Sequence, residues 1–187
     1  NMVYVSADGR YWLFGHLYDM QSQRDLTAER QQQYGRIDFS ILPLSDAITI
    51  KRGKGSRVLA VFSDPDCPYC KRLEQELAKL DDVTVHVFLY PLESIHPQAR
   101  AKSIAVWCTK DRADAWRNLM LSGKTPPKAN ASCNHPVDRN IELAMRLGIN
   151  GTPALFNAAG MRLDGAAPAQ RIEAFLAETA KIAEAKK

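Results

Sequence analysis

Short apolar blocks separated by turn residues divide the chain into expected strands and helices. Residues 57–62 are almost continuously apolar, which indicates a strand buried on both faces. Residues 71–80 place leucines at helical spacing, and residues 83–90 form a second strand block. These three segments predict a βαβ unit with parallel strands and a right-handed crossover. Another strand is expected at residues 47–50, before a glycine turn at 53–55.

The second half of the chain has the pattern of several helices, two short strands and a last helix. The spacing of apolar residues predicts helices at residues 99–108, 112–121, 138–147 and 168–185. Strands are expected at residues 154–157 and 161–163. We therefore predict an α/β fold for residues 46–187, with a helical insertion at about residues 97–147.

The amino-terminal segment predicts a β-hairpin, with strands at residues 3–5 and 11–18 around Asp8-Gly9. A lone hairpin is marginally stable, so we expect its sheet partners to precede Asn1 or to come from another chain. Asp25 or Thr27 is expected to cap a polar helix with little apolar surface to bury. We thus predict part of a small β domain at residues 1–24 and a linker helix at residues 25–45.

Composition and charge exclude two classes of function. The net charge is +4, and the 25 Lys and Arg residues are scattered among 21 acids, so nucleic-acid binding is not indicated. No apolar stretch approaches the roughly 20 residues that cross a bilayer, so no membrane insertion is expected. The first residues lack the charged and apolar blocks of a signal peptide, which we expect to be absent from this chain.

Two of the four cysteines stand at the junction between a predicted strand and a predicted helix. Cys67 and Cys70 lie in the run Cys-Pro-Tyr-Cys, so Cys67 falls at the helix N-terminus and Cys70 one turn inward. Unpaired N–H groups and the helix dipole stabilise a thiolate there. We therefore expect Cys67 to be a solvent-accessible nucleophile with a depressed pKa and Cys70 to be the resolving thiol. The neighbouring acids Asp64 and Asp66 are expected to oppose the depression.

Three other uses of these cysteines stay open: a structural zinc site, a purely structural disulfide and a metal-carrier site. Zinc sites usually supply two close pairs of ligands, whereas Cys108 and Cys133 are widely separated and only His135 is nearby. A disulfide inside the first turn of a helix closes too small a loop to constrain much of the chain. Redox use of Cys67 and Cys70, with no metal and no cofactor, is therefore favoured.

Longer motifs around the cysteines resemble one known family. The run Phe-Ser-Asp-Pro-Asp-Cys-Pro-Tyr-Cys-Lys at residues 62–71, with Gly-Thr-Pro at 151–153 before a strand, resembles the periplasmic disulfide isomerase family DsbC/DsbG. The likeness also covers residues 96–97, 104–108, 115–116 and 147–153. At the amino end, residues 4–9 and 15–19 match the close of that family's dimerisation domain.

The resemblance implies a thioredoxin fold with an inserted helical subdomain, preceded by a linker helix and a partial dimerisation domain. It implies that Cys67 attacks the substrate and that Cys70 resolves the mixed disulfide. The substrate-binding residues that it implies are Pro68, Tyr69, Thr152 and Pro153. The bond between the last two would be cis and would present backbone to the bound peptide, facing the sulfur of Cys67.

The implied function is the isomerisation and reduction of wrong disulfides in misoxidised or unfolded secreted proteins of the periplasm. A membrane thiol reductant resembling DsbD would keep the pair reduced, and the protein would be a homodimer when its N-terminal domain is complete. The segment before the linker is shorter than that domain, so we expect an amino-terminal truncation. Two other functions stay open, a net dithiol oxidase of the DsbA type if the chain is monomeric, and a chaperone-like binding module.

The resemblance also bears on the remaining cysteines and on the proton acceptor. Cys108 and Cys133 would close a loop of about 26 residues, worth roughly 3 kcal/mol in the chain-entropy model, and the family implies a structural bridge between them. The thioredoxin pattern carries a buried Asp six positions before the first cysteine, where this chain has Val61. A neighbouring group or the substrate must then accept the proton of the resolving thiol.

Three histidines and two tryptophans could be taken for site residues. The histidines His86, His96 and His135 show no Cys-His-Asp spacing, so we interpret them as surface or capping residues. Trp107 and Trp116 fall on apolar helix faces, so we expect them in the core.

Overall fold

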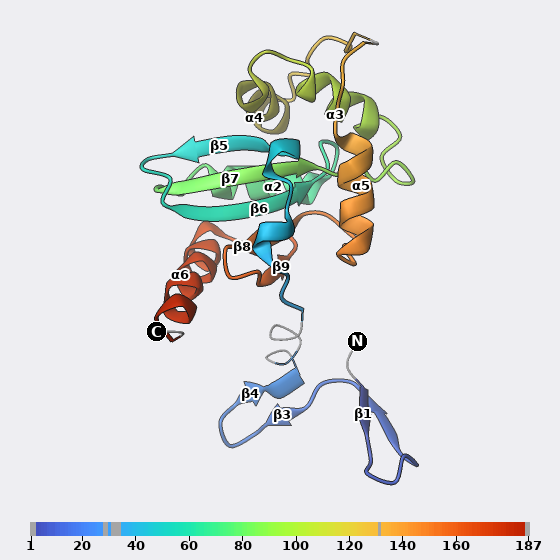
Figure 1. Ribbon diagram of the computed structural model, residues 1–187, viewed down its shortest axis with the longest axis vertical. Coiled ribbons are helices and arrows are strands. Elements are labelled where there is room, and N and C mark those ends of the chain that lie inside the picture. The colour runs from blue at the N-terminus through green and yellow to red at the C-terminus, as the bar shows by residue number, and fades with distance from the viewer. Residues whose placement is uncertain (1–2, 28–29, 31–34, 131, 186–187) are drawn as a thin grey trace.

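A five-stranded mixed sheet forms the centre of the fold, in the order β5-β7-β6-β8-β9 (Figure 1). The structure is a computed structural model that describes residues 3–27, 30, 35–130 and 132–185. The strands of the central sheet are β5 (Ile48–Arg52), β6 (Arg57–Ser63), β7 (Val83–Leu89), β8 (Ala154–Asn157) and β9 (Arg162–Asp164). The predicted strands of the main domain are therefore confirmed.

The predicted βαβ unit is the core of this sheet. Helix α2 (Pro68–Leu77) connects β6 to β7, and the two strands pair in parallel with Val61 opposite Val87. Strand β5 runs antiparallel to β7, and β8 runs antiparallel to β6. The central residues 59–62 of β6 have no exposed surface, which confirms a strand buried on both faces.

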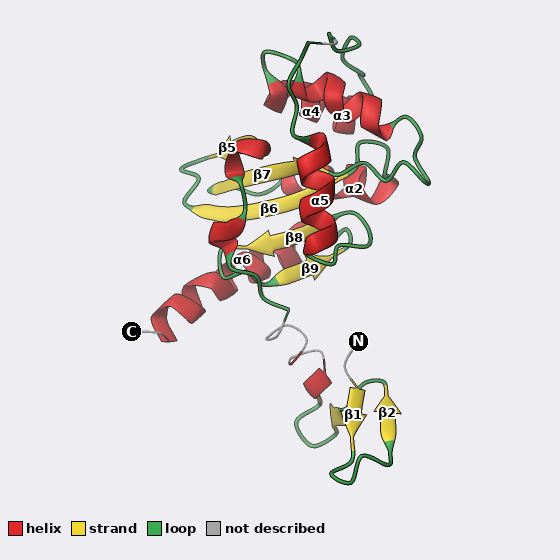
Figure 2. Cartoon of the chain, turned by 45° about the vertical axis from the view of Figure 1, so that its right-hand side comes forward, coloured by secondary structure: helices red, strands yellow, loops and turns green. Residues whose placement is uncertain are grey.

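Helices cover both faces of the sheet (Figure 2). Side chains of α2, α4 (Arg112–Ser122) and α6 (Ala169–Ala185) share one core cluster with alternate strand residues such as Val61. On the other face, α5 (Val137–Arg146) contributes to a cluster around Phe62 and Phe88, whose ring centroids lie 4.8 Å apart. Each face is apolar because successive side chains of a strand point to opposite sides.

The helical insertion lies between β7 and β8, as the sequence predicted. It consists of α3 (Ala99–Trp107), α4 and α5, and Figure 1 shows α3 and α4 above the edge of the sheet that β5 forms. Trp116 of α4 has no exposed surface and Trp107 is 6% exposed, so both tryptophans belong to the core as expected. The insertion thus brings its own large apolar side chains to the main core.

The amino-terminal segment forms two short hairpins rather than one. Strand β1 (Val3–Val5) pairs with β2 (Trp12–Phe14), and β3 (Tyr18–Asp19) pairs with β4 (Arg24–Asp25). The expectation of one strand over residues 11–18 is wrong, because the chain turns at Gly15, whose φ of 146° is open to glycine and not to other residues.

A buried hydroxyl group joins the two hairpins. Thr27 has no exposed surface, and its Oγ1 accepts a hydrogen bond from the Leu17 N–H at 2.7 Å and bonds the Tyr4 hydroxyl. Helical residues begin at Leu26, directly after Asp25, which is one of the two predicted caps. The rest of the predicted polar helix lies largely outside the described residues.

The described part of the predicted linker, from residue 35, contains two short 3-10 helices, η1 (Phe39–Ile41) and η2 (Leu44–Asp46). It is anchored on the sheet, since the Ile37 N–H donates to the Gly160 carbonyl at 3.0 Å and Leu42 is 4% exposed. A Cβ atom at Gly160 would lie 1.7 Å from the Ile37 oxygen, so this approach requires glycine. The division of the chain at residues 24 and 45 stays a prediction.

Candidate active site

The Cys67 and Cys70 side chains are positioned by the turn between β6 and α2. Cys67 is the N-cap residue of α2, and Pro68 occupies the first helical turn, where its missing N–H costs no helical hydrogen bond. The Lys71 N–H donates to the Cys67 carbonyl at 3.1 Å, which closes the first turn. Cys70 therefore lies one turn inside the helix, as predicted from the spacing.

The two thiols differ in protonation at neutral pH. A hydrogen bond from the Cys70 side chain is the largest of the effects that bring the pKa of Cys67 down to about 5. The backbone N–H groups of Cys70 and Tyr69 also lower this pKa, whereas burial opposes them. Burial raises the pKa of Cys70 far above its ordinary value. Cys67 is therefore a thiolate and Cys70 a thiol at neutral pH.

Cys67 is less accessible than the sequence suggested. It is 5% exposed, and Cys70 has no exposed surface. The cause is the segment before β8, where the Thr152 carbonyl oxygen lies 3.5 Å from the Cys67 Sγ. The bond between Thr152 and Pro153 is cis. The expectation of a solvent-accessible Cys67 is wrong because the pairing of β8 with β6 brings this segment over the helix start.

Asp64, three residues before Cys67, is bound on several sides. Its side chain has no exposed surface, and Oδ2 accepts from the Leu92 N–H at 2.6 Å and lies 3.0 Å from the His96 Nδ1. Its other oxygen, Oδ1, accepts from the Asp66 N–H at 2.7 Å. The Asp64 N–H in turn donates to the Cys70 Sγ at 3.4 Å. This carboxylate therefore joins the turn that carries the cysteines to the segment between β7 and α3.

Asp66 is paired with a lysine of the insertion. The Lys102 ammonium group, from α3, forms an ion pair with the Asp66 carboxylate. Neither acid is among the groups that shift the Cys67 pKa, contrary to the expectation that Asp64 and Asp66 oppose its depression. Hydrogen bonds stabilise the charge of Asp64 and a cation balances that of Asp66, and both weaken their effect on the thiolate.

The residues that the family resemblance assigned to substrate binding lie around Cys67. Pro68 and Tyr69 are exposed, Tyr69 by 59%, and they continue the chain directly after the nucleophile. Thr152 and Pro153 lie on the opposite side, over its sulfur, and line an open cavity of about 320 Å³ that extends to Arg162.

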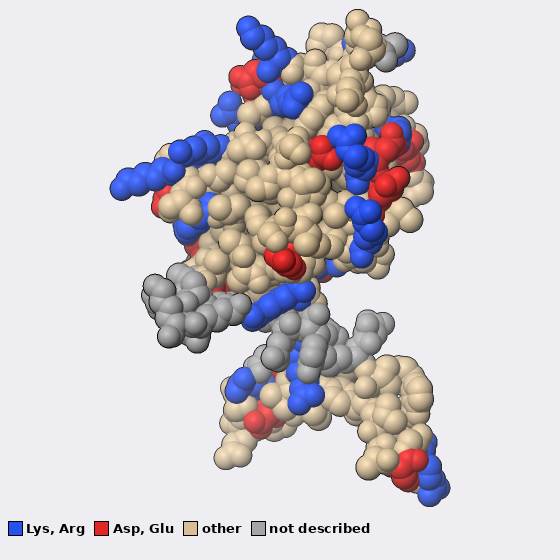
Figure 3. Space-filling view, viewed as in Figure 1, with Lys and Arg blue, Asp and Glu red and all other residues tan. Residues whose placement is uncertain are grey.

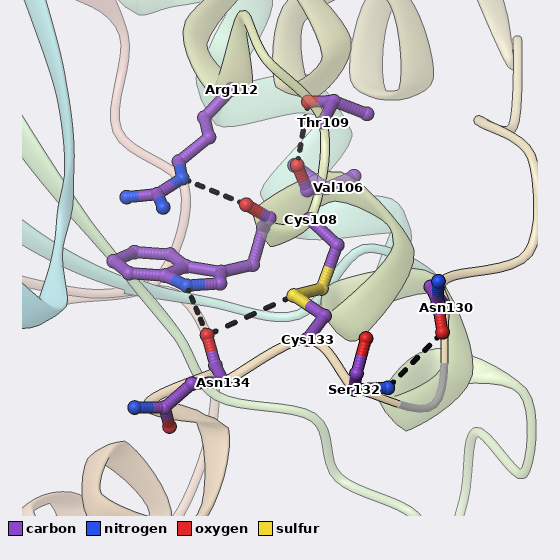
Figure 4. Close-up of a disulfide and its surroundings, with 9 residues drawn as sticks. Val106, Cys108, Thr109, Arg112, Asn130, Ser132, Cys133 and Asn134 are labelled. Carbon is purple, nitrogen blue, oxygen red and sulfur yellow. Dashed lines mark hydrogen bonds between the residues drawn. A yellow bond between two sulfur atoms is a disulfide. The ribbon is translucent and has the colours of Figure 1, made fainter.

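The other two cysteines form a disulfide that ties the end of α3 to the segment before α5 (Figure 4). The Cα atoms of Cys108 and Cys133 lie 6.1 Å apart. Beside the bridge, the Trp107 Nε1 donates to the Asn134 carbonyl at 3.1 Å, and the Arg112 guanidinium lies 3.8 Å from the centre of the Trp107 ring. A zinc site that uses all four cysteines is incompatible with this bond, because the two sulfurs are not thiolates.

The interpretation of the histidines as surface or capping residues is wrong for two of them. His86 lies in β7 and is 9% exposed, with its Nδ1 3.1 Å from the Thr49 Oγ1. His96 binds the buried Asp64. Both were missed because their partners are distant in sequence. His135 is half-buried, and its Nδ1 has no hydrogen-bond partner among the described residues.

One buried acid near the cysteines was not noticed in the sequence. Glu74 lies four residues after Cys70 on the buried face of α2 and is 2% exposed. Its Oε1 accepts from the Trp116 Nε1 at 2.6 Å, and burial raises its pKa. The available signal was its position between Leu73 and Leu77, on the apolar side of the helix.

In Figure 3, Lys, Arg, Asp and Glu side chains lie mainly around the rim of the main domain, and the middle of this face is largely uncharged. In the described part of the chain, no group of three His, Cys, Asp or Glu side chains is arranged to hold a metal ion. Among the same residues, no helix has the length and apolar character of a membrane span.

Two family models match the chain. The thioredoxin-like domain matches residues 44–180, and the disulfide bond isomerase N-terminal domain matches residues 1–28. The chain is 40% identical over 176 residues to the probable thiol:disulfide interchange protein DsbC of Bordetella pertussis, covering 94% of this chain and 62% of that protein. It is 25% identical to DsbC of Escherichia coli, over 99% of this chain and 77% of the relative.

The solved structures agree with these matches. The crystal structure of a disulfide interchange protein from Neisseria gonorrhoeae has a TM-score of 0.70 and 42% identity, covering 73% of this chain and 97% of that chain. The fold and the paired cysteines at a helix start define a thioredoxin-like thiol–disulfide protein. The chain belongs to the thioredoxin-like family and, within it, to the disulfide interchange proteins. Its curated relatives and the match of its first residues are similar to DsbC. It spans 62% of the length of the first Bordetella relatives.

Proposed function

We propose that this chain catalyses thiol–disulfide exchange and that it isomerises and reduces wrong disulfides in secreted proteins. The observation that carries the proposal is the Cys67 thiolate, with a pKa of about 5, directly in front of the buried Cys70 thiol. The thiolate is the reactive form of cysteine, and a second thiol within reach can release a trapped substrate. Cys67 is accordingly the nucleophile and Cys70 the resolving thiol.

The first step forms a mixed disulfide. The Cys67 thiolate attacks one sulfur of a substrate disulfide, the substrate S–S bond breaks, and the other substrate sulfur leaves as a thiolate with the electron pair. A different substrate thiolate then attacks the substrate sulfur bonded to Cys67, which forms a new substrate disulfide and releases the Cys67 thiolate. The substrate has been isomerised, and no electrons have been gained or lost.

The second route ends in reduction. Cys70 loses its proton and attacks the Cys67 sulfur, so that the substrate leaves as a thiolate and the enzyme holds a Cys67–Cys70 disulfide. A membrane thiol reductant resembling DsbD would return two electrons to this pair. We expect resolution by Cys70 to start more slowly than isomerisation, because burial raises the pKa of Cys70 and the thiol must lose its proton before it attacks.

Substrate peptides would bind around Cys67 through Pro68, Tyr69, Thr152 and Pro153. Tyr69 offers an exposed aromatic ring, and the cavity beside Thr152 and Pro153 is open. A site with backbone on one side and an exposed ring on the other suits unfolded chains of many sequences, since backbone contacts carry no side-chain preference.

The whole protein would be a periplasmic homodimer through its N-terminal domain. Support comes from the match of residues 1–28 to the isomerase N-terminal domain and from the apolar exposure of the two hairpins. The large apolar side chains there that are more than half exposed are Val5, Tyr11, Trp12, Leu13, Phe14, Tyr18 and Met20. The Cys108–Cys133 disulfide suits the oxidising periplasm.

A net dithiol oxidase is the second candidate, because a Cys67 pKa of about 5 stabilises the reduced form and makes the enzyme disulfide oxidising. The test is the refolding of a scrambled multi-disulfide protein by pre-reduced wild type, C70A and C67A. An isomerase keeps part of its activity in C70A, since isomerisation needs only Cys67, and loses it in C67A. Oxidase activity is measured separately, with the enzyme in its disulfide form and a fully reduced substrate, and both variants should lose it because neither can form the Cys67–Cys70 disulfide. Wild type no faster than C67A in both assays would contradict exchange catalysis altogether.

The role of the N-terminal domain needs a separate comparison. This chain and a form that carries a complete isomerase N-terminal domain, at equal concentrations of active sites and both pre-reduced, are compared on the same scrambled substrate, with the molar mass of each measured in solution. We expect a dimer of the longer form to rescue the substrate faster, because two catalytic domains hold one substrate. Equal rates would contradict the proposed role of dimerisation and leave the Cys67 chemistry intact. Binding of the unfolded substrate by a C67A/C70A variant would test the chaperone-like function.

A further inference from the structure

Glu74 is a buried acid whose carboxylate is incompletely bonded. Its Oε1 accepts one hydrogen bond, from Trp116, while Oε2 is buried and has no partner in the described part of the chain. Buried carboxylates are normally satisfied on both oxygens, because an unmatched charge in a low-dielectric interior is costly. This position is therefore unusual in a well-packed core and calls for a role besides packing.

The acid lies close to the cysteine pair. Residues four apart on a helix have Cβ atoms roughly 5–6 Å apart, and both Cys70 and Glu74 lie on the buried face of α2. Val61, at the position of the acid in the thioredoxin pattern, has no exposed surface and cannot titrate. Glu74 is therefore a buried acid on the same face of α2 as the resolving thiol, Cys70.

Charged groups from two neighbouring elements act on Glu74. Arg52, at the end of β5, and Arg117, on α4, favour its ionised form, and so does the hydrogen bond from Trp116. Arg117 is itself paired with Asp114 on the exposed side of α4, at 3.5 Å. From β7, alternate residues such as Val85 face α2, whereas His86 points to the other side of the sheet.

We propose that Glu74 is a proton-linked positioning group of the Cys67–Cys70 couple, which takes up a proton when the disulfide is reduced and releases it when the disulfide forms. The inference rests on the proposed function. Reduction adds two electrons and one proton to the pair at neutral pH, giving a Cys67 thiolate and a Cys70 thiol. A neutral disulfide thus becomes a site with one negative charge, and the Glu74 carboxylate binds a proton from solvent more tightly.

The size of the effect follows from the separation of the charges. The new negative charge is on Cys67, seven residues before Glu74 and therefore about two helical turns or roughly 10 Å away. At an effective dielectric constant of about 20, such a charge raises the proton affinity of a buried carboxyl group by roughly tenfold. By linkage, an ionised Glu74 makes reduction of the disulfide less favourable by the same factor, and a protonated Glu74 does not. The redox equilibrium of the cysteine pair should therefore depend on pH through a group that is not a thiol.

The test is the redox equilibrium of the pair with reduced and oxidised glutathione, measured from pH 5 to pH 9 for wild type and E74Q. Glutamine keeps the shape of the side chain and an acceptor for Trp116 but cannot ionise. We expect the equilibrium constants for reduction of the two proteins to agree at low pH and that of wild type to fall to roughly one tenth of the E74Q value at high pH. A purely structural role would change the equilibrium constant of E74Q by the same factor at every pH. That result would overturn the inference.

Two further variants complete the experiment. E76Q removes a carboxylate of the same helix that is paired with Lys79 and bonded to the Ala169 N–H. The hydrogen bond from Lys79 lowers the pKa of Glu76, so this group stays ionised over the assay range and E76Q should keep a constant ratio to wild type at every pH. W116F removes the hydrogen bond that favours the ionised Glu74, so the same fall should occur at higher pH, and this variant decides the question if E74Q does not fold. Failure of the cysteine pair to exchange with glutathione would contradict the proposed function. If the pair exchanges but the ratio of the wild-type to the E74Q equilibrium constant does not change with pH, only this inference is contradicted.

Discussion

The Nδ1 of His96 lies 3.0 Å from the Oδ2 of Asp64, a carboxylate that has no exposed surface. The histidine belongs to the segment between β7 and α3, and the aspartate to the turn that carries Cys67. Together with the Leu92 N–H, which donates to the same oxygen at 2.6 Å, His96 holds two segments 28–32 residues apart against each other. The geometry of the cysteine turn therefore depends on a contact outside the cysteine motif.

Removal of the His96 side chain should destabilise the protein through Asp64. The H96A variant leaves a buried carboxylate with one donor fewer, and an unsatisfied buried group costs about 1–3 kcal/mol. We expect the free energy of unfolding in urea to fall by about that amount. H96N, which keeps an N–H donor, should recover part of the loss, and equal stability of H96A and wild type would show that the contact contributes nothing.

The Cys70 side chain should control the ionisation of Cys67. A hydrogen bond from Cys70 is the largest cause of the low Cys67 pKa, so C70A should titrate at higher pH, closer to an ordinary thiol. C70S keeps a hydroxyl donor in the same place and should shift less. The ultraviolet absorbance of the thiolate, followed against pH in the reduced proteins, measures this order. If Cys67 has the same pKa in C70A as in wild type, the Cys70 side chain does not depress it and the backbone N–H groups do.

The reduced protein should gain stability relative to the disulfide form as pH rises. The pKa of Cys67 is about 5 in the folded state and 9.0 for an ordinary thiol, so the stabilisation is complete above pH 9 and is lost as pH falls towards 5. Cys70 does not change this window, because its raised pKa matters only above the ordinary thiol value. We expect a slope of at most about 1.4 kcal/mol per pH unit in the difference between the unfolding free energies of the two forms. Parallel curves for the reduced and oxidised proteins would contradict a depressed Cys67 pKa.

Loss of the Cys108–Cys133 bridge should weaken the insertion and spare the thiolate. The double variant C108A/C133A releases a loop of about 26 residues and should lower the free energy of unfolding by about 3 kcal/mol. Its Cys67 should keep the wild-type titration, since the bridge ties α3 to the segment before α5 and is not among the groups that shift the Cys67 pKa. A shifted Cys67 titration would show that the insertion adjusts the active site through the bridge.

Local sequence was sufficient for the cysteine pair and for most elements. A strand block, a Cys-Pro-Tyr-Cys run and a helical leucine pattern follow one another directly, so the N-cap position of Cys67 depends only on residues within one or two turns. The same holds for β6, whose apolar run requires burial on both faces whatever covers it. The sequence predicted one strand over residues 11–18 because apolar and aromatic residues continue on both sides of Gly15. The turn at this glycine divides them into two strands.

Contacts between distant segments were decided only by the tertiary structure. Strand β8 pairs with β6, and this pairing places the Thr152 carbonyl over Cys67 and buries its sulfur. The insertion folds back so that Trp116 meets Glu74, 42 residues away, and turns an unremarkable helical acid into a buried titratable group. Periodicity in a sequence reports which face of an element is buried, because that depends on neighbours along the same element. It does not report which distant side chain lies opposite, because many partners satisfy the same pattern and only the packed chain selects one.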